Sequence, residues 1–328
     1  MDVHASGIVT TERDDLSLTY RVLTKLMRPF RPKLAGIPTK PYPSSSPKLE
    51  PPKLGYDVKE HQRCGVYIYD IITQHGKQTP KRRLFYFAGG GFQGIPSDNH
   101  WKFCAELARQ LSPSYQVSVV SYPLAPPCPA PKSLPTLREM LHALISEAHE
   151  AHQDVCLMGD SSGGNIALSL GFWWASQMAS ESNLPPLHAI FAMSPAVDMT
   201  NANPEISEID KVDPLLTAKM TEDVAKTWVA EWERNNPHVS PLYGDFKVLK
   251  ASGVKVHGLI GTYDVLAPDA LKFRAVLAEA GIPGEWLIWK KQMHCFPLAF
   301  KFPIRESRQG KDWVVDVLRR DVKVEKSS

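Results

Sequence analysis

The stretch CLMGDSSGGNIALSL, residues 156–170, decides the fold of this 328-residue chain. It begins with a short apolar run, passes through Gly-Asp-Ser-Ser-Gly and ends in residues that favour a helix. A G-x-S-x-G pattern between a strand and a helix predicts a sharp turn that exposes the serine hydroxyl. The helix dipole favours negative charge there, so we predict that Ser161 is a nucleophile. The alternative is a Ser-Gly turn in a nucleotide-binding α/β protein, but no glycine-rich nucleotide motif accompanies it.

Apolar segments typical of strands alternate along the chain with segments typical of helices. This alternation predicts an α/β fold with a mostly parallel central sheet and helices on both faces. Residues 198–249 interrupt the alternation with helical sequence, which predicts a helical cap inserted over one end of the sheet. The expected strands cover residues 65–72, 82–88, 115–126, 154–160, 188–195, 254–264 and 284–291, and the expected helices cover 97–111, 133–152, 162–178 and 269–281.

The N-terminal 55 residues differ from the rest of the chain in composition and in the spacing of their apolar residues. Residues 16–30 place apolar side chains at helical spacing and predict an amphipathic helix that Pro29 ends. This helix either packs on the protein body or, being basic, makes weak contact with a membrane surface. Residues 29–55 are rich in proline, serine and lysine, which predicts an extended lid or linker. We therefore expect an N-terminal helix with a cap or linker segment at 1–55 and one larger α/β domain at 56–328.

Composition excludes several classes of function. A net charge of +3 gives no reason to expect nucleic acid as a partner. The five cysteines are scattered and form no CxxC pair, so we expect neither a disulfide framework nor a metal site, and a reducing compartment. The first residues lack the apolar core of a signal peptide, and no apolar run is long enough for a transmembrane segment. We expect a cytoplasmic protein.

A serine hydroxyl needs a base, and that base needs an orienting carboxylate. When a nucleophilic serine lies on such a sharp strand-to-helix turn, called a nucleophile elbow, the acid and then the histidine come later in the chain. Each lies in a loop after a later strand. Asp264 stands just beyond the apolar segment HGLIGTY, and His294 just beyond WLIWKKQM. Asp269 lies further along the same loop, where it could cap a helix, and Asp198 comes one strand too early.

Other histidines fit the base less well. His188 and His257 lie in or beside expected strands, where a structural role suits them. His149 and His152 lie on an expected helix and face solvent. His294 is therefore the predicted base.

Three glycines in YFAGGGFQG, residues 86–94, follow another expected strand. When Ser161 attacks a carbonyl, the oxyanion that forms needs fixed donors. The backbone amides of Gly90 and Gly91, with that of Ser162, can converge on it if no side chain intervenes. A phosphate cradle is the alternative, but no lysine completes it.

The order of five motifs resembles that of the hormone-sensitive-lipase-like, or arylacetamide-deacetylase-like, α/β-hydrolases. These motifs are AGGGF, GDSSGGN, SPL at Ser240, GTYDVLAPD and MHCF. The resemblance covers residues 84–297, and the N-terminal YRVLTKLMRPFRPKL is similar to the leader of fungal members. These include steryl-acetyl-hydrolase-like enzymes and hydrolases of secondary metabolism. The resemblance implies a carboxylesterase with a cap.

Carried over by motif, the resemblance implies a triad of Ser161, Asp264 and His294, and an oxyanion loop of Gly89, Gly90 and Gly91. The family's loop begins with a histidine that supports its amides, and here Ala88 takes that position. Loss of this support predicts reduced activity, a narrowed substrate range or a repurposed pocket, because oxyanion donors work only when they are pre-organised.

The leading hypothesis is hydrolysis of an acetyl, short acyl or lactone ester of a hydrophobic small molecule, with no metal or organic cofactor. Under this hypothesis, the enzyme acts in secondary-metabolite biosynthesis. A second hypothesis keeps the triad but replaces water with another nucleophile, giving acyl transfer or cyclisation. In that case Trp228 and Trp232 of the cap would exclude water, unless they merely pack. A third hypothesis is a ligand-binding protein on a retired hydrolase scaffold, although such proteins typically lack the histidine.

Overall fold

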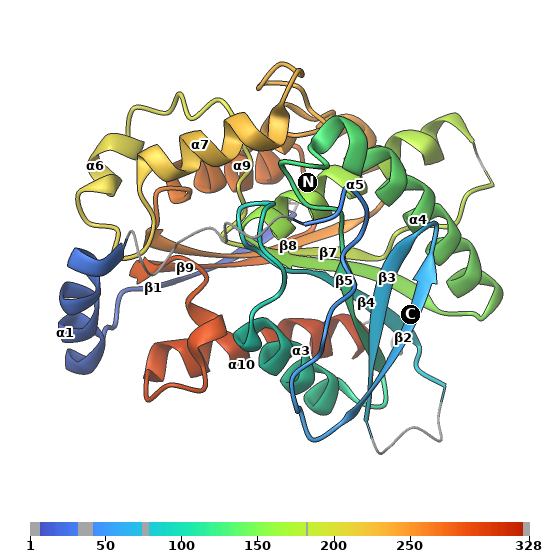
Figure 1. The fold of residues 1–328 in the computed structure, drawn as a ribbon, viewed down its shortest axis with the longest axis horizontal. Coiled ribbons are helices and arrows are strands. Elements are labelled where there is room, and N and C mark those ends of the chain that lie inside the picture. The colour runs from blue at the N-terminus through green and yellow to red at the C-terminus, as the bar shows by residue number, and fades with distance from the viewer. Residues whose placement is uncertain (1–6, 32–41, 74–78, 182, 324–328) are drawn as a thin grey trace, which may run out of the picture.

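The computed structural model describes residues 7–31, 42–73, 79–181 and 183–323 (Figure 1). In these ranges a nine-stranded sheet has the order β1-β9-β8-β7-β6-β4-β5-β3-β2. The strands are β1 Ile8–Arg13, β2 Asp57–Arg63, β3 Val66–Ile72, β4 Arg82–Phe87, β5 Tyr115–Ser121, β6 Asp154–Asp160, β7 Ala189–Met193, β8 Lys255–Tyr263 and β9 Gly284–Met293.

The sheet is mostly parallel, as the alternating pattern predicts. The pairs from β5 through β4, β6, β7, β8 and β9 to β1 are parallel, and only β3 pairs antiparallel with β5 and with β2. β6 lies between β4 and β7, and its residues are almost all buried. Interior parallel strands have covered faces, which accounts for the continuous apolar run of β6.

Helices cover both faces of the sheet (Figure 1). α4 Ala130–Glu150, α5 Ser162–Ser180 and α9 Ala267–Glu279 pack on one face, where Met140, Ile166 and Phe273 belong to one buried cluster. α3 Asp98–Leu111 and α10 Arg305–Lys323 pack on the other face, where Phe103 and Val314 belong to a second cluster. The predicted α/β fold class is confirmed.

Three elements escaped the sequence analysis. β1 adds a parallel edge strand beside β9, and β2 forms an antiparallel edge strand beside β3. Their sequences, IVTTER and DVKEHQR, are largely polar because an edge strand buries little of its surface. α10 was not predicted, because charged residues dominate its sequence, RESRQGKDWVVDVLRRDVK, although Val314 and Leu318 are both buried.

The N-terminal segment lies against the loops at one end of the sheet. α1 Leu18–Met27 and η1 Arg28–Phe30 form where the amphipathic helix is predicted. Residues 42–55 pack on the body, since the Ser46 hydroxyl donates to the carbonyl of Ser121 at 2.5 Å. The lid or linker expected at 29–55 includes residues 32–41, which lie outside the described residues.

Short helices follow β7 in the region expected to form the cap. They are α6 Ile206–Asp210, α7 Ala218–Val229, η2 Pro241–Tyr243 and α8 Phe246–Ala251. Asn165 of α5 joins this region to the sheet, since its amide donates to the carbonyls of Ala196 at 2.6 Å and Val239 at 2.7 Å. Within the described ranges, no helix is both long and apolar enough to cross a membrane.

Candidate active site

Ser161 occupies the turn between β6 and α5. Its φ is 54° and its ψ is −122°, a conformation that costs a non-glycine residue about 1–3 kcal/mol. Two neighbours must be glycine, because a Cβ on Gly159 would lie 2.3 Å from the carbonyl oxygen of Gly163, and a Cβ on Gly163 would lie 2.0 Å from that of Phe87. The N–H of Ser161 donates to the carbonyl of Met193 at 2.9 Å. This close packing holds the serine on its strained turn.

Asp264 and His294 follow β8 and β9, and these neighbouring parallel strands bring them together. Nδ1 of His294 lies 2.7 Å from Oδ2 of Asp264. Asp264 is fully buried, and its Oδ1 accepts from the N–H of Leu266 at 3.0 Å. Burial by itself lowers the pKa of His294, but the negative charge of Asp264 outweighs it and raises that pKa well above its ordinary value.

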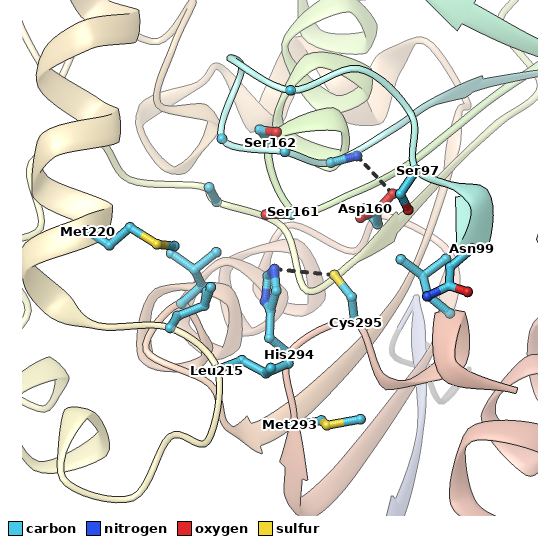
Figure 2. A pocket seen from close by; sticks show the side chains of 18 of the residues that line it. Ser97, Asn99, Asp160, Ser161, Ser162, Leu215, Met220, Met293, His294 and Cys295 are labelled. Atoms are coloured by element: carbon cyan, nitrogen blue, oxygen red, sulfur yellow. Dashed lines mark hydrogen bonds between the residues drawn. The ribbon is translucent and has the colours of Figure 1, made fainter. Parts of the chain in front are cut away.

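The other ring nitrogen of His294 contacts a thiol. Nε2 lies 3.3 Å from Sγ of Cys295, the next residue (Figure 2). Burial raises the pKa of the Cys295 thiol to about 12, so the thiol stays protonated. In the neutral form of His294, Nδ1–H donates to Asp264 and the lone pair of Nε2 accepts from the thiol. Cys295 therefore occupies the lone pair that a serine nucleophile would use, and sequence reasoning missed it although it follows the predicted histidine directly.

Ser161 and His294 line one cavity of about 830 Å³ (Figure 2). Its floor holds residues of the glycine loop, the elbow and the histidine loop. Most of the remaining lining is apolar and comes from α1, from the segment between the glycine loop and α3, from the cap, and from η3 Phe296–Ala299 with the residues that follow it. These apolar residues are Leu23, Met27, Ile95, Leu215, Leu216, Met220, Val224, Leu298, Phe302 and Ile304.

The glycine loop after β4 has a conformation that suits glycine. Gly90 has a φ of 138° and Gly91 a φ of 61°. The N–H of Gly89 donates to Oδ1 of Asp160 at 3.0 Å. In the part of the chain that the structure describes, the N–H groups of Gly90 and Gly91 have no hydrogen-bond acceptor. Ser162 starts α5, so its N–H belongs to a first turn that has no intrahelical acceptor.

The loop is held from three sides without a histidine at position 88. The hydroxyl of Tyr122 donates to the carbonyl of Ala88 at 2.8 Å, and Ala88 itself is fully buried. The ring of Phe92 stacks on Trp228 of α7, with 4.2 Å between centroids. Trp228 thus packs on the loop, while Asp160 holds Gly89 from below. None of these supports was foreseen, because each joins residues far apart in the sequence.

Asp160 ionises more readily than an ordinary aspartate. Burial raises its pKa, but the interactions with His100, with the hydroxyl of Tyr86 and with the N–H of Gly89 outweigh burial and hold the pKa below its usual range. Tyr86 donates to Oδ1 at 2.6 Å. The carboxylate beside the elbow is therefore an anion that organises its neighbours.

A second buried carboxylate, that of Asp213, joins the cap to the loop after β8 that carries Asp264. Oδ1 of Asp213 accepts from the N–H groups of Leu215 at 2.7 Å and Leu216 at 2.9 Å, and Oδ2 accepts from the N–H of Val265 at 2.8 Å. Burial, together with the negative charge of Asp264, raises the pKa of Asp213 to about 7. Asp213 fixes two cavity-lining residues relative to the acid.

The N-terminal segment also supports the site. The hydroxyl of Tyr20 in α1 accepts from the N–H of Met293 at 2.7 Å, directly before His294. Arg31 donates to the carbonyls of Asp210 at 2.5 Å and Asp213 at 3.2 Å in the cap. Residues 7–31 thus brace both the histidine loop and the cap.

The competing residues lie elsewhere. Asp269 lies in the first turn of α9 and accepts from the amide of Asn203 at 2.9 Å, while burial raises its pKa to about 6. Asp198 borders the cavity and accepts from the hydroxyl of Tyr243 at 3.0 Å. The carboxylate that meets His294 is that of Asp264.

Two other histidines have structural partners. Nε2 of His188 lies 2.7 Å from Oδ2 of Asp321, and Nδ1 of His257 accepts from the N–H of Glu285 at 3.0 Å. Across the described ranges, no three histidine, cysteine, aspartate or glutamate side chains gather closely enough to hold a metal ion.

A family described by the alpha/beta hydrolase fold matches residues 84–298, and the chain belongs to this family. It is similar to an esterase of Acinetobacter venetianus, with 28% identity over 66% of this chain and 67% of the esterase. It is also similar to Esterase LipU of Mycobacterium tuberculosis, with 26% identity over 71% of this chain and 77% of LipU.

Solved structures share the fold. An esterase/lipase from an uncultured bacterium matches with a TM-score of 0.74 and 19% identity, over 93% of this chain and 99% of that chain. A hormone-sensitive lipase from a metagenome library matches with a TM-score of 0.72 and 21% identity, over 93% of this chain and 98% of that chain.

Proposed function

We propose that the protein hydrolyses carboxylic esters of hydrophobic small molecules through an acyl-enzyme on Ser161. The observation that carries this proposal is the 2.7 Å contact between His294 and Asp264, in a cavity that Ser161 also lines. Asp264 orients the ring through Nδ1, which leaves Nε2 as the nitrogen that would take the serine proton once the thiol of Cys295 is displaced. The relatives named as esterases support the same reaction class.

In the first half of the reaction, Oγ of Ser161 attacks the ester carbonyl while Nε2 of His294 takes the serine proton. The tetrahedral oxyanion accepts hydrogen bonds from backbone N–H groups of Gly90, Gly91 and Ser162. We assign Gly89 a supporting role in this loop, because its own N–H already donates to Asp160. The imidazolium then protonates the leaving alcohol.

In the second half, water attacks the acyl-enzyme and His294 removes its proton. Collapse of the second oxyanion breaks the bond to Ser161 and releases the acid, and His294 returns the proton to the serine. The raised pKa of His294 suits it to hold a proton between these steps. These steps use side-chain and backbone groups of the chain alone.

The cavity favours an apolar substrate. About 830 Å³ is within the range that holds a drug-sized molecule, and the lining presents methyl and methylene groups from α1 and the cap. The ester carbonyl must reach Ser161 on the polar floor, so the acyl group there is short, such as acetyl, or part of a lactone. A role in secondary metabolism stays a prediction.

The other two hypotheses gain less support. In an acyl transferase, Trp228 would exclude water from the cavity. Its ring instead stacks on Phe92 of the glycine loop. A retired binding scaffold has no need for a buried carboxylate that orients a histidine at the cavity, as Asp264 orients His294.

Serine-directed labelling tests the function. A fluorophosphonate should label wild-type protein on Ser161, as located by peptide mass spectrometry, and should leave Ser161→Ala unlabelled. Wild-type protein should then release acetate from p-nitrophenyl acetate. Folded protein that neither reacts with the probe nor cleaves an ester would contradict the proposal.

We also propose that α1 contacts an anionic lipid surface. Leu18 and Leu26 of α1 and Phe30 of η1 are 77%, 64% and 58% exposed, whereas Leu23 of α1 lines the cavity. Arg21, Lys25 and Arg28 lie between these exposed apolar residues in the sequence. A basic helix with exposed apolar residues matches anionic headgroups above acyl chains, and other residues of this helix line the substrate cavity.

Sedimentation with vesicles tests this contact. Wild-type protein should bind vesicles that contain phosphatidylserine more tightly than vesicles of phosphatidylcholine, and Leu18→Ser with Leu26→Ser should abolish binding. Val9→Ser is the matched control, because Val9 is 62% exposed on β1. Equal sedimentation of the double variant and wild type would contradict the proposal. So would a wild-type dimer that the double variant separates, because α1 would then bind a second copy.

A further inference from the structure

His100 lies in the first turn of α3, and both of its ring nitrogens have partners. Nδ1 lies 3.0 Å from the backbone nitrogen of Ser97 and 2.8 Å from its hydroxyl oxygen. Nε2 lies 3.2 Å from Oδ2 of Asp160. The residue is only 8% exposed, although it borders the cavity. It thus joins the start of α3 to the carboxylate beside the nucleophile.

These contacts determine where the imidazole proton lies. A backbone N–H only donates, so Nδ1 of His100 must accept from Ser97. A neutral imidazole that accepts at Nδ1 carries its proton on Nε2. Nε2–H therefore donates to Asp160, which only accepts when ionised. The Ser97 hydroxyl, in turn, accepts from the backbone of His100 in a capping box.

Asp160 passes this constraint to the glycine loop. Its Oδ1 accepts from the hydroxyl of Tyr86 at 2.6 Å and from the N–H of Gly89 at 3.0 Å. Its Oδ2 accepts from His100, and among the described residues no other side chain or backbone group donates to that oxygen. A buried carboxylate oxygen without a donor is costly, so loss of this bond would favour rotation of the carboxylate away from Gly89.

The space around Gly89 leaves little tolerance for such a rotation. A Cβ on Gly89 would lie 2.4 Å from Oδ2 of Asp160 and 3.0 Å from Cβ of Ser161. The loop backbone, the carboxylate and the nucleophile are thus in direct contact. A shift of the carboxylate moves the amides that follow Gly89.

We propose that His100 is a positioning residue for the oxyanion-binding amides. Its Nε2–H fixes the carboxylate of Asp160, and that carboxylate fixes Gly89 and orients Gly90 and Gly91 without contacting substrate. This role rests on the proposed ester hydrolysis. It also explains how a loop that begins with Ala88 is pre-organised.

Two substitutions separate positioning from helix capping. His100→Asn keeps an acceptor near Nδ1 for Ser97 but removes the donor to Asp160. His100→Gln keeps an amide donor that reaches Asp160 but removes the acceptor for Ser97. Each loses one hydrogen bond, so we expect a similar decrease in melting temperature for the two variants.

Their activities should differ. With p-nitrophenyl acetate, kcat of His100→Asn should fall about tenfold with KM unchanged, because loss of oxyanion stabilisation affects only the transition state. His100→Gln should keep kcat within about twofold of wild type by the same argument. Equal kcat values in the two variants would overturn the proposal and leave His100 a helix cap.

A spectroscopic measurement gives an independent readout. In protein labelled with 15N-histidine, the signals lost in His100→Asn should show a proton on Nε2 and none on Nδ1. The opposite tautomer would overturn the inference while leaving the proposed function intact. Wild-type protein that cleaves no ester would instead overturn the proposed function, and this inference with it.

Discussion

The two walls of the cavity are built differently. The wall at the carboxyl ends of the strands consists of polar groups that hydrogen bonds fix, such as Asp160 on Gly89 and Asp264 on His294. The opposite wall, from α1 and the cap, consists of apolar side chains such as Leu23 and Met220. Hydrogen bonds are directional, whereas apolar contacts tolerate changes of shape. The first wall therefore fixes the chemistry, and the second adjusts which ester fits.

The largest expected effect comes from the nucleophile. Ser161→Ala should lower kcat by at least about 10⁴-fold, because no other group replaces the serine oxygen in the acyl-enzyme. The melting temperature should change little, since that side chain contributes little packing. Steady-state kinetics with p-nitrophenyl acetate and a thermal melt check both points. Activity above a hundredth of wild type would move the chemistry to another group.

Asp213 of the cap tests how strongly the two walls depend on each other, because it joins them through hydrogen bonds. Asp213→Asn should destabilise the fold by about 2 kcal/mol, since an amide cannot accept all three backbone N–H groups that Asp213 accepts. Chemical denaturation at about pH 5, below the raised pKa of Asp213, measures this loss. Retention of wild-type stability would show that the link is dispensable.

The pH dependence of stability gives a further readout of the same residue. The pKa of Asp213 is raised from 3.8 to about 7 by folding, so the folded state holds this proton more tightly than the unfolded state. The contribution of Asp213 to stability is therefore fully present below about pH 4 and is lost as the pH rises through about 7. Unfolding free energies across this range should decline less steeply in Asp213→Asn than in wild type.

Changes on the apolar wall should alter selectivity without altering chemistry. Leu216→Ala or Met220→Ala should raise KM about tenfold for esters with a bulky apolar group, because each removes several methylene contacts. The kcat for p-nitrophenyl acetate should stay near wild type. A matched change on the surface, Val9→Ala, should alter neither constant. A fall in kcat for both substrates would show that the apolar wall takes part in catalysis.

The smallest expected effect comes from Cys295. Its thiol occupies Nε2 of His294 at 3.3 Å, so the serine must displace it before attack. Cys295→Ala should raise kcat by about fivefold at most, which corresponds to a hydrogen bond worth about 1 kcal/mol. Pre-steady-state acylation rates measure this change. A decrease in rate would show that the thiol aids catalysis rather than competing with the serine.

Much of the fold could be predicted because local patterns encode it. The apolar run and glycines around Ser161 predict a strand, a sharp turn and a helix, and all three are present. β1 and β2 could not be predicted in this way, since edge strands with polar sequences lack a periodic apolar signal. The same limit applies to Tyr20, whose contact with Met293 joins residues 273 positions apart.

By itself, the sequence determined the α/β class, the sharp turn at Ser161 and the order in which the proposed nucleophile, acid and base follow the strands. These features depend on residues near one another in the chain. Only the tertiary structure decided that Asp264 rather than Asp269 meets His294, and that Asp160 and His100 support a glycine loop that begins with alanine. These contacts arise where loops from different strands meet, and no local pattern records which side chains will face each other there.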